Sequence, residues 1–178
     1  LFIPREQISM ADAAWRVWML GPDGTYLPAS GEVVAASIED VRVMIGLLER
    51  LGSTVTKAGA DSWLIKSGER SGDLDRDLVE AIRGSILLLG PLLTSVGEAT
   101  LTPPGGDVIG LRRLDTHLWG LSALGASFTI EDHHITLRAK QLPLIGGDIF
   151  LDEASVTATE NVIMAASLAA GESIITNA

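Results

Sequence analysis

The sequence predicts an α/β domain assembled from two copies of one helix–strand–strand–helix–strand unit. Apolar residues at helical spacing alternate along the chain with short strand-like runs. Two tripeptides also return about 74 residues later: Leu51-Gly52-Ser53 as Leu124-Gly125-Ala126, and Gly97-Glu98-Ala99 as Gly171-Glu172-Ser173. Because this period is too long for a solenoid repeat, we expect pseudo-symmetric α/β units in which helices bury one face of each sheet.

Each predicted element has a local signal. Ser37 and Asp40 resemble a capping box at the start of the first helix, and Gly52 lies where a C-terminal glycine belongs. Residues 67–77 are polar and read as a loop, and Gly125 ends the first helix of the second copy. We expect helices over residues 37–51, 78–93, 115–124 and 155–170. We expect strands over residues 54–56, 63–66, 99–102, 127–130, 135–138, 147–151 and 173–176.

The chain is predicted to have a short N-terminal segment and one main domain. Residues 1–32 form the segment, in which Gly21-Pro22-Asp23-Gly24 is a strong turn signal for a hairpin. Residues 33–178 form the domain, with the two copies at about 33–102 and 103–178. The chain opens at Leu1 without methionine and stops directly after a strand-like run, so we expect a fragment or a trimmed chain.

Composition limits the possible partners. The 178 residues are 47% hydrophobic, enough for a sizeable core, and no apolar run reaches the roughly 18 residues of a membrane span. A net charge of −10 argues against nucleic acid as the main partner, although local arginines can still hold a small anion. There is no cysteine, and His133-His134 lacks a third ligand nearby. We expect no metal, no cofactor, no membrane contact and a cytoplasmic location.

Residues 103–117 are the strongest candidate for chemistry. Two prolines open this stretch, three glycines surround the single acid Asp107, and Arg112 and Arg113 follow. Glycine permits positive φ and close approach of a ligand, and each guanidinium fits phosphate or carboxylate. The alternative from composition alone is a plain turn between strand and helix, with Asp107 solvated and the arginines pairing with neighbours.

Four stretches carry a resemblance to a known family: residues 84–92, 104–112, 114–117 and 152–161. In that order they resemble Arg-Ala-Ser-Ile-x-x-Leu-Gly-Pro-Leu, Pro-Gly-Gly-Cys-x-Ile-Gly-x-Arg, Val-Asp-Leu-His and Asp-x-x-Ser-Val-Gly-Ala-Thr-Glu-Asn of the UDP-N-acetylglucosamine enolpyruvyl transferases. The resemblance covers roughly residues 33 to 178. It implies an enolpyruvyl transferase-like fold of inside-out α/β units with βαβαββ order, three to a domain and two domains to an enzyme.

The resemblance also implies a reaction. The family transfers the enolpyruvyl group of phosphoenolpyruvate to UDP-N-acetylglucosamine in peptidoglycan precursor synthesis and releases phosphate. Both substrates are anions, so the chemistry needs fixed cations and an acid that protonates the enol carbon. Asp107 stands where the family usually has a reactive cysteine, which implies Asp107 as the proton donor; the alternative is an inactive copy. Fosfomycin, which alkylates that cysteine, is expected not to label this protein.

The resemblance implies catalytic roles for Asp107 and Arg112 and a set of residues against the substrates. Arg83 matches an arginine that meets the nucleotide sugar, or else pairs with Glu80. Asp115 accepts a substrate hydrogen bond, or else caps the next helix. The expected substrate-binding residues are Arg83, Arg112, Arg113, Leu114, Asp115, Thr116, Glu153, Ala154, Ser155 and Val156.

The chain departs from the family at several points. Arg113 replaces a proline, and Glu153 stands where lysine is common, which is unfavourable beside a diphosphate. The Lys-Asn pair that holds phosphoenolpyruvate in the family is absent, and so is a second domain. We therefore expect the loop-bearing half of an active site, without turnover by this chain alone. The rival hypotheses are a 3-phosphoshikimate 1-carboxyvinyltransferase-like enzyme and a non-catalytic binding relic.

Overall fold

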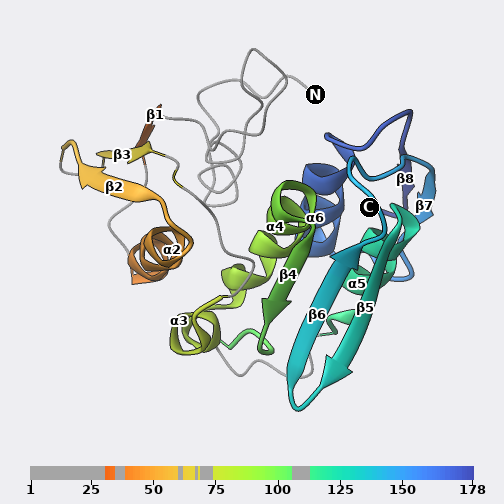
Figure 1. The fold of residues 1–178 in the computed structure, drawn as a ribbon, viewed down its shortest axis with the longest axis horizontal. Coiled ribbons are helices and arrows are strands. Elements are labelled where there is room, and N and C mark those ends of the chain that lie inside the picture. The colour runs from red at the N-terminus through yellow and green to blue at the C-terminus, as the bar shows by residue number, and fades with distance from the viewer. Residues whose placement is uncertain (1–30, 35–38, 60–61, 67, 69–73, 106–112) are drawn as a thin grey trace. The chain divides into compact units, whose positions relative to one another are not determined.

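A computed structural model describes residues 31–34, 39–59, 62–66, 68, 74–105 and 113–178 (Figure 1). The chain divides into two compact units, Leu1–Glu69 and Arg70–Ala178, and each is considered by itself. The hairpin expected within residues 1–30 and the helix start expected at Ser37 lie outside the described residues. The division into a segment 1–32 and a domain 33–178 stays a prediction.

The first unit contains one helix and one small sheet. Strand β1 (Gly31–Val34) precedes helix α2 (Glu39–Arg50), and β2 (Thr54–Lys57) and β3 (Ser62–Lys66) follow it. The antiparallel sheet has the order β1-β3-β2. Val41, Leu48 and Leu51 lie at helical spacing and are buried, and Leu47 is buried as well. Gly52 has φ of 96°, and the N–H of Ser53 donates to the Leu48 carbonyl, so α2 ends at the predicted glycine.

The second unit contains the remaining elements. Its helices are α3 (Arg76–Ala81), the 3₁₀ helix η1 (Arg83–Leu88), α4 (Leu89–Val96), α5 (Asp115–Ala123) and α6 (Val156–Ala166). Its strands are β4 (Glu98–Leu101), β5 (Ala126–Glu131), β6 (His134–Ala139), β7 (Asp148–Phe150) and β8 (Ile174–Thr176). Strands β4, β6 and β5 form an antiparallel sheet in that order, and β7 pairs in parallel with β8.

The two compact units share part of their element order, although the predicted copies at about 33–102 and 103–178 stay a prediction. In the first unit, β1 precedes α2 and pairs with the second hairpin strand β3; in the second unit, β4 precedes α5 and pairs with β6. The glycines of the repeated tripeptides also match in conformation. Gly52 and Gly125 have φ of 96° and 97°, and Gly97 and Gly171 have φ of 85° and 87°. Gly52, Gly97 and Gly125 each end a helix in the left-handed region, where a side chain is disfavoured, and Gly171 has the same conformation in the turn after α6.

The single helix predicted over residues 78–93 was wrong. The chain forms α3, η1 and α4 instead, because Ile82 is extended, with φ of −136° and ψ of 146°. The Ser85 hydroxyl donates to the carbonyls of Val79 and Ile82 at 3.0 and 2.8 Å, so a side chain competes with the helical hydrogen bonds. The predicted loop over residues 67–77 was also too long, since Asp75 caps α3 by accepting from the Leu78 N–H.

In the second unit the helices form the interior. Helix α6 packs against both α4 and α5, and the β4-β6-β5 sheet packs on α4 and α5 (Figure 1). Every residue from Leu89 to Thr94 is buried, so α4 is covered on all sides. Such a helix is apolar all round, as the run of leucines requires. Among the described residues, no helix is long and apolar enough to cross a membrane.

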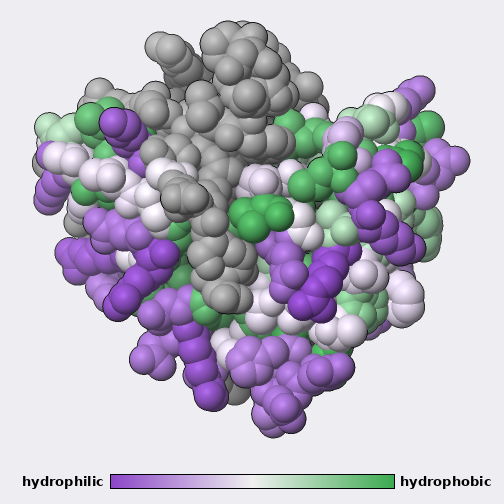
Figure 2. Space-filling view, in the orientation of Figure 1, coloured by the Kyte–Doolittle hydropathy of each residue, from purple (hydrophilic) through white to green (hydrophobic). Residues whose placement is uncertain are grey.

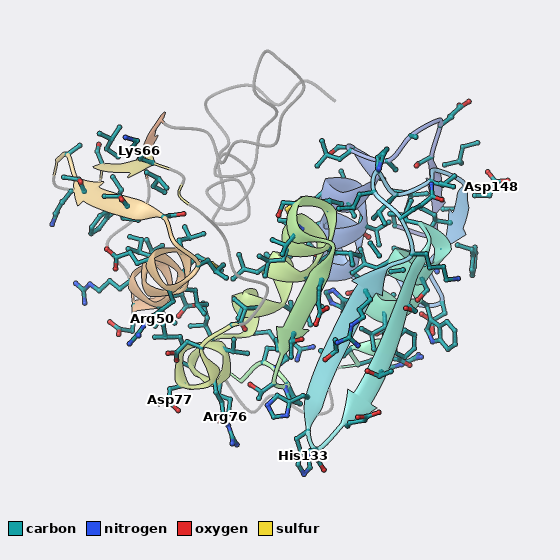
Figure 3. The ribbon with its side chains drawn as sticks, viewed as in Figure 1. Arg50, Lys66, Arg76, Asp77, His133 and Asp148 are labelled. Atoms are coloured by element: carbon teal, nitrogen blue, oxygen red, sulfur yellow. The ribbon has the colours of Figure 1, made fainter. Side chains whose placement is uncertain are left out.

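The β5–β6 hairpin turns sharply through Asp132 and His133, between the two strands predicted there. Their φ values are 47° and 63°, so both central residues are left-handed, as in the primed turns that match the twist of a hairpin. Figure 3 places His133 at the outer tip, and Figure 2 shows a hydrophilic surface there. Within the described ranges, no group of three His, Asp or Glu residues could hold a metal ion.

A polar network lies inside the helical layer. The Asn161 amide is fully buried and accepts from the Gly90 N–H at 2.7 Å, while its nitrogen donates to the Ile86 carbonyl at 2.7 Å. The same nitrogen lies 3.1 Å from Nδ1 of the buried His117. Gly90 permits this contact, because a Cβ there would lie 2.6 Å from the Asn161 carbonyl oxygen. The network therefore ties α6 to both α4 and α5.

Gly90→Ala is expected to lower the free energy of unfolding by about 1–3 kcal/mol, because the added methyl group meets backbone that cannot move aside. Gly147→Ala is the matched control, since a Cβ at Gly147 meets nothing within 4 Å. Urea unfolding of both variants measures the difference. Equal stability of the two variants would show that α4 and α6 are not in such close contact.

His117 is expected to make folding pH-dependent. Burial, with a smaller contribution from the charge of Arg83, lowers the pKa of His117 to about 4. In the unfolded chain the pKa is about 6.5, so that state takes up the proton first as pH falls. Stability is thus lost between about pH 6.5 and pH 4, by on the order of 3 kcal/mol, and this loss stops below pH 4. Urea unfolding at several pH values measures this loss. The free energy of unfolding should fall less between pH 6.5 and pH 4 in His117→Gln than in the parent, and should fall as much as in the parent in the exposed control His134→Gln.

Candidate functional site

The starts of α5 and α6 form the candidate site. The two helices pack together, and the Thr116 hydroxyl in the first turn of α5 donates to Asp152 Oδ1 at 2.8 Å, just before α6. This bond brings the two segments expected to bind substrate, residues 114–116 and 153–156, next to each other. Glu153, Ala154 and Val156 are exposed, so a ligand can reach the α6 side.

Arg113 joins the two segments at the surface. Its guanidinium donates to both carboxylate oxygens of Asp115 and, at 2.6 Å, to Asp152 Oδ2. Its Nη1 lies 3.8 Å from Glu153 Oε2. The hydrogen bond from Arg113 is the main cause that lowers the pKa of Asp115, and the pKa of Arg113 is raised by Asp115 first and then Asp152. Three carboxylates, those of Asp115, Asp152 and Glu153, thus surround one guanidinium.

The start of α6 offers backbone donors. Ser155 is the N-cap, and its hydroxyl accepts from the Ala158 N–H at 3.4 Å, while its carbonyl accepts from the Thr159 N–H. The N–H groups of Val156 and Thr157, at the first two helical positions, have no acceptor within the helix. Such groups, together with the helix dipole, favour an anion at this end.

Both flanks of the glycine-rich loop are held in the second unit. On the entry side, the Gly105 N–H donates to the Val79 carbonyl at 3.3 Å, and a Cβ at Gly105 would overlap the Glu80 carbonyl. On the exit side, Arg83 Nη2 donates to the Arg113 carbonyl at 3.3 Å. Asp107 and Arg112, the two expected catalytic residues, lie outside the described residues.

Several sequence expectations can be compared with these contacts. Arg83, Arg113, Leu114, Asp115 and Thr116 do lie around one helix start. Leu114 is the N-cap of α5 and makes no side-chain cap bond, so the alternative that Asp115 caps this helix was wrong. The Asp115 carboxylate binds Arg113 instead.

The residues expected to bind substrate on the α6 side also lie close together. Glu153, Ala154, Ser155 and Val156 lie around the start of α6. Glu80, the other partner considered for Arg83, pairs with Arg76 at 2.7 Å.

Sequence reasoning did not give roles to four residues that hold the site together. Asp152 links Arg113 and Thr116, and His117, Thr157 and Asn161 form a chain of contacts behind them. All four lie inside the four stretches that resemble the family, and this membership was the sequence signal that could have identified them. Their partners are distant in sequence, so no local pattern indicates the pairs.

The comparisons with known proteins agree with this fold. A sequence model of the EPSP synthase (3-phosphoshikimate 1-carboxyvinyltransferase) family matches residues 35–178. The enolpyruvyl transferase NikO from Streptomyces tendae has a similar structure, with a TM-score of 0.67 and 21% identity over 83% of this chain and 35% of that one. EPSP synthase from Acinetobacter baumannii gives a TM-score of 0.63 at 19% identity, over 83% of this chain and 35% of that one.

Curated relatives are more similar in sequence. The UDP-N-acetylglucosamine 1-carboxyvinyltransferase of Treponema denticola is 50% identical over 142 residues, which are 79% of this chain and 33% of the relative. The protein of the same name from Borrelia garinii is 47% identical, over 80% of this chain and 33% of the relative. The chain thus spans about a third of the length of these relatives. With a fold of the same kind and a family match over most of its length, the chain belongs to the EPSP synthase family of carboxyvinyltransferases.

Proposed function

We propose that this chain supplies the loop-bearing part of an enzyme that transfers enolpyruvyl from phosphoenolpyruvate to UDP-N-acetylglucosamine. Such an enzyme would act in peptidoglycan precursor synthesis in the cytoplasm and would include a second domain of the same fold. The observation that supports this most directly is the Thr116–Asp152 hydrogen bond, which makes neighbours of the two segments expected to bind the sugar nucleotide. The names of the relatives given above favour the UDP-sugar over shikimate 3-phosphate as the acceptor.

The proposed binding mode uses backbone donors and arginines together. The free N–H groups of Val156 and Thr157 would bind the diphosphate, because they point out of a helix start and carry its partial positive charge. Arg83 and Arg113 lie on the α5 side and would add positive charge nearby. Arg112 would contribute a third guanidinium from the loop, by its match to the family motif alone.

Asp107 is the proposed acid. Protonation of the terminal carbon of the enol makes its neighbour electrophilic, and the sugar hydroxyl adds to that neighbour and loses its own proton. Phosphate then leaves as the terminal carbon gives a proton back, which restores the double bond. A carboxylic acid can do this at neutral pH if its surroundings raise its pKa. The support is the position of Asp107 between the glycines of the loop motif.

A non-catalytic binding relic is the second candidate, and one observation favours it. Asp115, Asp152 and Glu153 together outnumber Arg113, so the described part of the site is negative where a diphosphate would approach. Calorimetric titration with UDP-N-acetylglucosamine separates the candidates. Heat at micromolar ligand supports the transferase, whereas a folded protein that gives no heat supports a relic that has lost this ligand.

Glu153→Lys is expected to tighten UDP-N-acetylglucosamine binding by roughly fivefold, on the order of 1 kcal/mol, because it replaces a repelling carboxylate beside the diphosphate by a cation at a screened, exposed position. Glu172→Lys makes the same charge change at another exposed position and should leave the affinity unchanged. Calorimetry at two salt concentrations measures both, and the gain should shrink at high salt. Equal gains in the two variants would mean that only net charge matters.

Asp107→Asn is expected to lower the turnover number by about 10²- to 10⁴-fold, the usual contribution of a general acid. Asp107→Cys should retain part of the activity and become labelled by fosfomycin, while the parent stays unlabelled, because a thiolate is much the better nucleophile. The protein expressed from its complete reading frame is assayed for phosphate release, and labelling is read by mass spectrometry. Full activity of Asp107→Asn would remove Asp107 from the mechanism.

A further inference from the structure

His117 has no part in the proposed chemistry, yet it lies directly behind both segments of the site. It follows Thr116 in the first turn of α5, and Thr157 follows Val156 in the first turn of α6. Only 1% of His117 is exposed, and its Nε2 lies 3.3 Å from the Thr157 hydroxyl. The ring therefore spans the gap between the two helix starts on their buried side.

The hydrogen bonds around Asn161 determine which ring nitrogen carries the proton. The Gly90 N–H can only donate, so the Asn161 atom 2.7 Å from it is the amide oxygen. The amide nitrogen then faces both the Ile86 carbonyl and His117 Nδ1. Because an amide nitrogen only donates, Nδ1 must accept and carries no proton.

The direction of the last bond follows. A neutral imidazole with a bare Nδ1 has its proton on Nε2, and that N–H donates to the Thr157 hydroxyl. The bonds thus run in one direction, from Asn161 through His117 to Thr157. Burial keeps the ring neutral, because the charged form would lose its hydration and no carboxylate in the described part of the chain pairs with it.

We propose that His117 is a positioning residue, locked as the neutral Nε2–H tautomer, which fixes the first turn of α6 against the first turn of α5 through Thr157. The proposal rests on the proposed function for its consequence, because these two turns carry the expected nucleotide-binding segments. On the outer side, Asp152 already bonds Thr116 and Arg113. The His117 bond holds the same two turns on the inner side, so the helix starts are fixed at two points and cannot rotate relative to each other.

Thr157 makes this arrangement a feature of this chain. The family motif quoted above has glycine at this position, whereas here the side chain supplies the acceptor for His117. Thr157→Val removes the hydroxyl with little change in shape, and Thr157→Ser restores it. Thr159→Val is the matched control on the same helix, because the Thr159 hydroxyl is buried and has no hydrogen-bond partner among the described residues.

The first measurement is the ring itself. ¹⁵N-histidine labelling of the protein distinguishes protonated from bare ring nitrogens by NMR. We expect a single neutral form of His117 with the proton on Nε2, and a slowly exchanging ring proton that exchanges much faster in Thr157→Val. A proton on Nδ1, or a mixture of tautomers, would overturn the proposal.

The second measurement tests positioning. In Thr157→Val, amide hydrogen exchange in the first turn of α6 should rise and the dissociation constant for UDP-N-acetylglucosamine should increase about fivefold, the usual effect of one lost hydrogen bond. Thr157→Ser and Thr159→Val should match the parent in both. Unchanged exchange and affinity in Thr157→Val would refute a positioning role. If the parent itself binds no UDP-N-acetylglucosamine, the proposed function fails, while the ring and amide measurements still decide the geometry.

Discussion

The second unit depends on one buried amide. Asn161 has no exposed surface, so each of its polar atoms must find a partner inside the protein. Its oxygen binds the N–H of Gly90 and its nitrogen binds the carbonyl of Ile86, near the junction where η1 gives way to α4. Because a buried donor or acceptor without a partner costs more than its bond contributes, this amide fixes α6 relative to that junction.

The consequences of that constraint reach the surface through His117. With α6 fixed, His117 of α5 contacts Asn161 and Thr157 of α6, and the starts of the two helices lie next to each other. At the surface, Arg113 and Asp152 continue the connection with exposed ion pairs. Exposed pairs contribute little to stability, typically up to about 1 kcal/mol, so the buried network sets the geometry and the surface cluster tunes the charge.

How far the sequence predicts this structure depends on how far apart in the sequence two hydrogen-bonded residues lie. The helix ends at Gly52, Gly97 and Gly125 were predictable from local sequence, because glycine is the residue that a left-handed helix end favours. The repeated tripeptides place such a glycine at matching positions. The break at Ile82 was not, since the bonds of Ser85 to two carbonyls lie inside an apolar run that reads as one helix. The site was predicted as two segments from motifs, but the Thr116–Asp152 bond that joins them crosses from α5 to α6 and has no local signal.

The placement of helices inside and sheets outside explains why the candidate site lies at helix starts. Every residue of α4 from Leu89 to Thr94 is buried, so the sides of such a helix cannot meet a ligand. The exposed faces of the sheets carry contacts such as the bidentate Arg138–Glu98 pair, whose polar groups already have partners. Helix starts differ, because their first N–H groups have no acceptor within the helix. A protein built this way therefore presents backbone donors where α5 and α6 begin, and the partial positive charge there favours an anion.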